Sequence, residues 1–260
     1  MKQAFFFELN FVFRTESLFL FFTPNCQFMK KLSLVHFSAI GLIILSILMS
    51  YVYFLNTGNF NSPVIEFEFV KNSKDVKDIF MQDNELKYNE IKGVNDQNIV
   101  DFAYMLFYSS LLVFTLLKIK KTDNKIFFNL AIVFSVIAFL SDIFENIELF
   151  KITKYILNGN DFSEPVKMLF VITRLKWLSI AFVMFLLSFH YYKNGIIGKI
   201  FALISALPLL TVFAFIVSKD AGNDFVKIFT SFIILGFVIL MIWIFISKKI
   251  NANVNFYKNT

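Results

Sequence analysis

The chain has 260 residues, of which 57% are apolar and 17% are charged, and its formal net charge is +6. A mean hydropathy of +0.67 and few charges exclude an ordinary soluble domain, in which about 25% of residues are charged. The lysines flank apolar segments instead of forming one basic patch, so we expect no nucleic-acid partner.

The first 28 residues are apolar but are interrupted by Glu8, Arg14 and Glu16. Met29 follows and opens a pattern of two lysines and a long apolar run, which is typical of an uncleaved inner-membrane anchor. We therefore predict that the native chain starts at Met29 and that 1–28 is a wrongly assigned extension. The alternative is an amphipathic helix that lies on the membrane surface.

Long apolar runs recur through residues 29–260, which we predict to form one integral membrane domain. A transmembrane helix needs about 20 apolar residues, and six runs reach this length. The predicted fold class is an all-α transmembrane six-helix bundle whose partner is the lipid bilayer. The predicted spans lie near 33–55, 99–118, 126–149, 168–191, 197–217 and 225–247.

The segments between the predicted spans alternate in charge. Residues 118–125 contain four lysines and one acid, and 192–199 contain two lysines and no acid. Residues 56–98, on the opposite side, contain five lysines and eight acids. Lysine-rich loops stay in the cytoplasm, and the lysine and phenylalanine excess favours a bacterial source. We predict a multi-pass protein of the bacterial inner (cytoplasmic) membrane, with both termini inside and 56–98 outside.

Residues 56–98 carry the signals of a small folded cap. The sequence VIEFEFV at 64–70 alternates apolar and acidic residues with a period of two, which predicts a strand. The sequence NSKDVKDIFMQD at 72–83 predicts a short helix that is capped by Ser73 and has one apolar face. We therefore predict an extracytoplasmic strand-plus-helix cap between the first two spans.

The third and fourth predicted spans carry opposite charges at matching depths, about 10 Å from their outer ends. Asp142, Glu145 and Asn146 share one face of the third span, and Lys176 lies in the fourth. Charge inside an apolar span is costly and is usually paired or functional. The predicted polar cluster consists of Asp101, Asp142, Glu145, Asn146, Thr173, Arg174, Lys176 and Trp177.

The fourth span orients its two cations differently. Thr173, Lys176 and Trp177 share one face, whereas Arg174 lies about 200° around the helix from Lys176. We therefore expect one cation to pair with the acids and the other to extend toward the lipid headgroups. Asp101, near the outer end of the second span, is placed to join the acids.

The two charged segments read S-D-I-F-E-N at 141–146 and T-R-L-K-W at 173–177. A D-x-x-E-N helix followed by a T-x-x-K-W helix resembles a family of small uncharacterised bacterial polytopic membrane proteins. The resemblance covers roughly residues 64–185, and Arg174 is not part of the family pattern. The family has no assigned activity, so the resemblance implies the topology and the choice of residues but no reaction.

The residues that membrane enzymes require do not converge in this sequence. His36 and His190 both fall near the cytoplasmic side, and Cys26 is the single cysteine, so we expect no metal site. Ser179 and Ser205 lack the glycine context of a serine nucleophile, and no phosphate-binding glycine loop is present. We expect no catalytic residue and no cofactor.

Three functions stay open, of which the first is preferred. The protein is a non-enzymatic membrane component whose cluster only locks the bundle, or a small transporter that binds a solute or ion there, or an outward-facing lipid-modifying enzyme. An unknown small solute or protein would then be a partner. A water-accessible cavity reaching Asp142, Glu145 and Lys176 would favour the transporter, whereas closed ion pairs would favour the lock.

Overall fold

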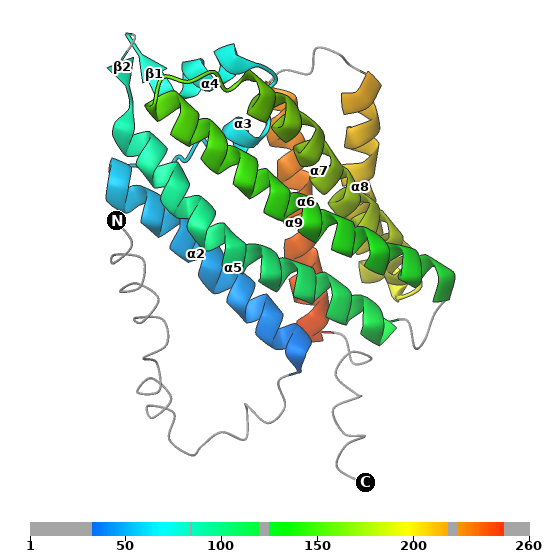
Figure 1. The fold of residues 1–260 in the computed structure, drawn as a ribbon. Helices are drawn as coiled ribbons and strands as arrows, with labels where there is room; N and C mark the ends of the chain where they lie inside the picture. The colour runs from blue at the N-terminus through cyan, green and yellow to red at the C-terminus, as the bar shows by residue number, and fades with distance from the viewer. Residues whose placement is uncertain (1–32, 84, 120–124, 218–222, 247–260) are drawn as a thin grey trace, which may run out of the picture. The chain divides into compact units, whose positions relative to one another are not determined.

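The computed structural model describes residues 33–83, 85–119, 125–217 and 223–246. The predicted extension at 1–28 and the predicted start at Met29 lie outside these residues. The described residues from Leu34 onward belong to one compact unit. The described part of this unit contains eight helices and one two-stranded sheet (Figure 1), so the predicted all-α fold is confirmed.

Six of the helices are long and apolar enough to cross a membrane. Each packs against the next one along the chain, and α9 also contacts α2 and α7 (Figure 1). This is the architecture of a multi-pass membrane protein. The six helices are α2 (Leu34–Thr57), α5 (Tyr88–Ile119), α6 (Lys125–Leu157), α7 (Ser163–Tyr192), α8 (Gly195–Val217) and α9 (Asn223–Ile246).

Consecutive long helices run in opposite directions, so their ends gather in two groups. At one end, Lys227 near the start of α9 forms an ion pair with Glu66, which follows α2 in the chain, at 3.3 Å. At the other end, His36 near the start of α2 packs on Phe245 near the end of α9, with 5.2 Å between ring centroids. The start of α2 and the end of α9 therefore lie together.

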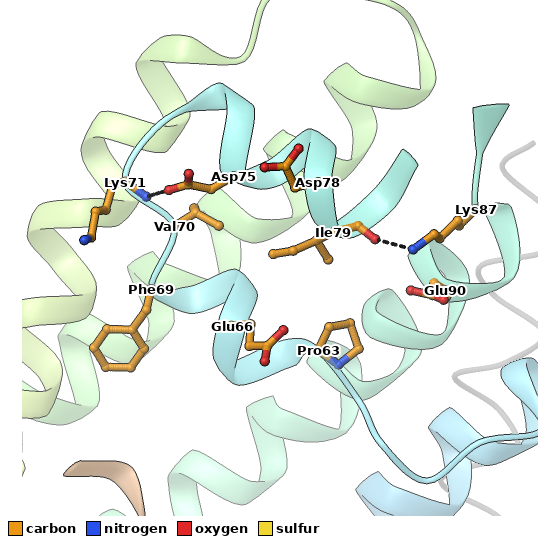
Figure 2. A pocket seen from close by; sticks show the side chains of 10 residues that line it. All are labelled: Pro63, Glu66, Phe69, Val70, Lys71, Asp75, Asp78, Ile79, Lys87 and Glu90. Carbon is orange, nitrogen blue, oxygen red and sulfur yellow. Dashed lines mark hydrogen bonds between the residues drawn. The ribbon is translucent and has the colours of Figure 1, made fainter. Parts of the chain in front are cut away.

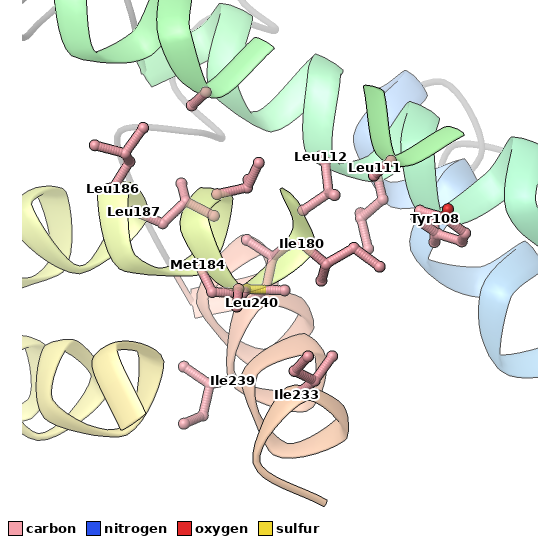
Figure 3. Close-up of a cluster of buried hydrophobic side chains, with 14 of the residues drawn as sticks. Tyr108, Leu111, Leu112, Ile180, Met184, Leu186, Leu187, Ile233, Ile239 and Leu240 are labelled. Atoms are coloured by element: carbon pink, nitrogen blue, oxygen red, sulfur yellow. The ribbon is translucent and has the colours of Figure 1, made fainter. Parts of the chain in front are cut away.

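Buried apolar side chains from all six long helices form one cluster, which we call the bundle core. Figure 3 shows part of it, including Leu112 of α5, Met184 of α7 and Leu240 of α9. The opposite faces of the helices expose large apolar residues such as Ile47 and Leu203. Such faces suit contact with lipid, in which apolar surface is not penalised.

A second cluster, which we call the cap core, lies at the end of the bundle where Lys227 meets Glu66. It joins the segment between α2 and α5 to the adjoining turns of α2, α5, α6 and α7. Its buried members are Tyr53, Phe67, Val70, Val76, Phe80, Ile91, Val94, Leu149, Ile152, Ile156, Phe162, Val166 and Leu169.

Three helices are longer than the segments that were predicted to span the membrane. Helix α5 begins at Tyr88, whereas the second span was predicted from 99. Helix α6 ends at Leu157 and α7 begins at Ser163, whereas the third span was predicted to end at 149 and the fourth to begin at 168. The added turns are too polar for a hydropathy signal, but their apolar side chains, such as Ile91 and Ile152, are buried in the cap core. Tertiary contacts therefore stabilise these turns.

The cap occupies residues 58–87, between the end of α2 and the start of α5. It contains α3 (Val64–Glu68), α4 (Ser73–Phe80) and a hairpin in which β1 (Met81–Gln82) pairs antiparallel with β2 (Glu85–Leu86). The strand predicted at 64–70 is wrong, because this segment forms α3. Its consecutive residues Phe67 and Glu68 are both buried, whereas the predicted strand would have alternated between a buried and an exposed face.

The helix predicted at 72–83 is confirmed as α4, but Ser73 is not its N-cap. Asn72 precedes the helix with an extended backbone (φ −156°, ψ 171°). Its side-chain oxygen accepts the backbone N–H groups of Lys74 at 2.9 Å and Asp75 at 3.1 Å. Asn72 therefore satisfies donors that have no partner within the first turn.

Candidate functional site

Lys176 lies near the middle of α7, and its ammonium group is buried among three carboxylates. Its Nζ lies 2.7 Å from Glu145 Oε1, 3.2 Å from Asp142 Oδ1 and 3.1 Å from Glu68 Oε2. An ammonium group has three N–H donors, so these contacts use all of them. We call Lys176, Glu68, Asp142 and Glu145 the Lys176 cluster.

The Lys176 cluster separates the two apolar cores. Along α7, Leu169 belongs to the cap core and Ile180 to the bundle core, and Lys176 lies between them. Along α6, the two acids of the cluster lie between Ala138 of the bundle core and Leu149 of the cap core. The site is therefore a polar layer within an otherwise apolar interior.

The predicted pairing between the third and fourth spans is present in the structure. Asp142 and Glu145 lie one turn apart on α6, so both carboxylates face α7. About 22 Å of helix separates Asp142 from the end of α6 at Leu157, because α6 continues past its apolar run.

Glu68 is the member of the cluster that the sequence analysis missed. It ends α3, 108 residues before Lys176 in the chain. Its Oε2 also accepts the indole N–H of Trp177 at 3.1 Å. The sequence signal for Glu68 was its position as an acid within the apolar stretch from Phe67 to Val70. The alternation of apolar and acidic residues there was interpreted as a strand. Through Glu68, the cap is bonded directly to α7.

Helix α5 is bonded to α6 beside the cluster. The Tyr108 hydroxyl donates to Asp142 Oδ2 at 2.7 Å. The Asn146 amide donates to Asp101 Oδ2 at 2.6 Å. Asp101, which was predicted to join the acids, thus pairs with Asn146 and forms no bond with Lys176 among the described contacts.

The remaining predicted residues lie on α7. The Lys176 ammonium lies 5.0 Å from the Trp177 ring, which is close enough for a cation–π contact. Thr173 is fully buried on the same face. Arg174 is turned away, as its angular position predicted. Its Nη1 donates to the Phe170 carbonyl at 2.8 Å, and its guanidinium lies over the Phe170 ring.

The cluster is arranged to bind positive charge from an ammonium group. Among the described residues, no group of three or more histidine, cysteine or acidic side chains is placed to hold a metal ion. The carboxylates converge on Lys176, and all of them are buried. The geometry thus supports ion pairing and hydrogen bonding inside the protein.

A separate hollow of about 470 Å³ opens at the cap (Figure 2). Lys87 donates to the Ile79 carbonyl at 3.2 Å across it. Four of the residues that line this hollow are acidic and two are lysines, and none of them belongs to the Lys176 cluster. The lining residues are Pro63, Glu66, Phe69, Val70, Lys71, Asp75, Asp78, Ile79, Lys87 and Glu90.

The chain matches no protein-family model, no curated protein and no solved structure. The resemblance of 141–146 and 173–177 to a bacterial membrane family therefore stays a prediction. The fold and the site define a class: a multi-pass membrane protein with a buried ion-pair cluster between its bundle and its cap.

Proposed function

We propose that this protein is a non-enzymatic component of the bacterial inner membrane in which the Lys176 cluster locks the cap onto the bundle. The observation that carries the proposal is the bonding of one buried ammonium group to carboxylates of both α3 and α6. Apolar attraction is non-directional, whereas these bonds form only when α3 and α6 both bring their carboxylates to Lys176 Nζ. The lock would give the cap a single position on the bundle.

The closed geometry of the cluster favours the lock over a transport site. Its side chains are buried and bonded to one another. The hollow at the cap and two further hollows nearby are lined by other residues. A lipid-modifying enzyme gains no support either, since Asp142 and Glu145 face Lys176 and not an open surface.

The hollow at the cap gives the solute-binding alternative a specific location. Its acids outnumber its lysines, which suits a small cationic solute. Spermidine is a suitable probe, and calorimetry on the purified protein measures its binding. The alternative predicts that Asp78→Asn abolishes binding, while Asp161→Asn, an exposed acid outside the hollow, does not. No binding to the parent protein would exclude this polyamine site.

The proposed orientation places the cap outside the cell and both termini in the cytoplasm. It is supported by the lysine-rich sequence at 118–125. The helix ends that this sequence connects, Ile119 of α5 and Lys125 of α6, lie at the opposite end of the bundle from the cap. In a Cys26→Ser background, Asn160→Cys should react with an impermeant maleimide added to intact cells. Asn194→Cys should react only after the membrane is opened. The reverse pattern would invert the topology.

The lock is tested through the exposure of a buried cap residue. Val76 of α4 is fully buried in the cap core, so Val76→Cys in a Cys26→Ser background should resist maleimide. Adding Lys176→Met should expose this cysteine, because three buried carboxylates lose their partner. Neutralising the acids as well (Glu68→Gln, Asp142→Asn, Glu145→Gln) should restore protection. Full protection in the Lys176→Met protein would refute the lock.

A further inference from the structure

The Lys176 cluster holds more negative charge than Lys176 can balance. One ammonium group faces three carboxylates. A fourth acid, Asp101, is bonded to Asn146, the residue that follows Glu145 in α6. If all three carboxylates around Lys176 were ionised, the buried site would carry two uncompensated negative charges. Burying an unpaired charge is costly, and such a group tends to neutralise by taking up a proton.

The three carboxylates are not equally supplied with donors. Glu68 Oε2 accepts from both Lys176 and Trp177. Asp142 accepts from Lys176 through one oxygen and from Tyr108 through the other. Glu145 accepts only from Lys176, and its Oε2 is buried with no hydrogen-bond partner among the described residues. Glu145 is therefore the carboxylate whose charge is least stabilised.

We propose that Glu145 is a proton-binding site and is a neutral carboxylic acid when the cap is docked. Its Oε1 is then the carbonyl oxygen that accepts from Lys176 at 2.7 Å, and Oε2 carries the hydrogen. The step adds one proton from water to a carboxylate and breaks no other bond. The inference rests on the proposed lock, because it assigns a ligand to the same cluster.

The proton makes docking of the cap dependent on pH. As the pH rises, loss of the proton creates an anion beside carboxylates that already share one cation, so the docked cap should be stable at neutral pH and released at alkaline pH. The titratable and polar groups in and around the Lys176 cluster come from four elements. They are Glu68 of α3, Asp101, Tyr104 and Tyr108 of α5, Asp142 and Asn146 of α6, and Thr173, Lys176 and Trp177 of α7.

Infrared spectroscopy of the full chain in lipid vesicles tests the proposal. A protonated carboxyl gives a carbonyl stretch that ionised carboxylates lack and that shifts in D₂O. We expect this band in the parent protein at neutral pH and its loss in Glu145→Gln. The control is Glu148→Gln, since Glu148 lies one turn further along α6 and pairs with Lys151 at 2.7 Å. This variant should keep the band.

The outcomes separate the proton site from the lock. Absence of the protonated-carboxyl band from the parent protein would overturn the proton site, and this measurement does not depend on the folding of any variant. A band that survives Glu145→Gln but disappears in Asp101→Asn would also overturn it. Cap release by Lys176→Met without any band would leave the lock standing. Loss of the band in Glu145→Gln would support the proton site. If, in addition, Val76→Cys stayed protected from maleimide in the Lys176→Met protein, the proton site would stand and the lock would be overturned.

Discussion

The bundle core and the cap core share the same long helices, but different forces stabilise them. Helices of the bundle core exchange lipid contacts for helix contacts, so their association depends on packing and on polar bonds. The cap core lies under charged cap residues, and in the proposed topology its burial removes apolar surface from water. Such burial stabilises the folded state by about 25 cal/mol per Å² of apolar surface removed from water.

The Lys176 cluster lies between the bundle core and the cap core, where the source of stabilisation changes from helix packing to burial from water. Apolar attraction is non-directional in both cores, whereas the three bonds of Lys176 hold only while all three acceptors stay within hydrogen-bond distance. This contrast between apolar contacts and hydrogen bonds indicates that a buried polar layer, although costly, can determine how two apolar cores are aligned. Substitutions in each core and in the layer between them separate these contributions.

The largest expected effect comes from removing the cation that joins the two cores. Lys176→Met leaves the buried carboxyl groups of Glu68, Asp142 and Glu145 without their shared donor and should lower the free energy of unfolding by about 3–5 kcal/mol. Chemical unfolding in detergent measures this change. Lys167→Met is the matched control, because this lysine is on the same helix and its pair with Glu164 is exposed. Equal effects of the two substitutions would contradict a special role for burial.

A cavity in the cap core should open the cap and leave the bundle folded. Phe80 is fully buried and packs edge-to-face on Phe67 with 4.8 Å between centroids. Phe80→Ala should cost about 3–5 kcal/mol of cap stability. Hydrogen exchange should then rise in 64–86 but not in α7. Phe60→Ala, at a site that is 61% exposed, is the control. Faster exchange throughout α7 would show that the two cores unfold together.

Glycines at the two cores should respond differently to the same substitution. A Cβ on Gly93 would lie 2.8 Å from Tyr53 Cδ2, where α5 approaches α2 beside the cap core. Gly93→Ala should therefore destabilise the protein by about 1–3 kcal/mol, as overpacking does. A Cβ on Gly236 would lie 3.4 Å from the flexible Met184 side chain in the bundle core.

Gly236→Ala should thus be neutral or stabilising, since alanine is favoured over glycine in a helix by about 1 kcal/mol. Thermal unfolding of the two variants in the same detergent makes the comparison. A larger loss of thermal stability for Gly236→Ala than for Gly93→Ala would show that the close approach of α5 and α2 does not require glycine at position 93.

The smallest expected effect concerns the edge of the cap. Asn72→Ala removes the side chain that accepts two backbone N–H groups of α4 and should cost about 1 kcal/mol of local stability. Ser73→Ala should change little, because Ser73 is inside the helix. Hydrogen exchange of α4 amides distinguishes the two variants. A larger effect of Ser73→Ala would restore the N-cap that the sequence predicted.

Hydropathy and charge were sufficient for the broad architecture and for part of the site. Apolar runs predicted the six long helices, since a span must be continuous in sequence. Helical spacing placed Asp142 and Glu145 on one face and separated Lys176 from Arg174, since angles along a helix follow from residue numbers. The pairing of α6 with α7 then followed from a short connection between antiparallel helices.

Only the tertiary structure decided how the cap meets the bundle. The polar turns that begin α5 and end α6 are helical because a core formed by distant segments buries their apolar side chains. The conformation of the cap brings Glu68 to Lys176, which lies 108 residues further along the chain. The alternation of apolar and acidic residues around Glu68 did not reveal this contact. Continuous spans and helix faces are local properties of a chain, whereas the alignment of two cores depends on contacts that no local pattern records.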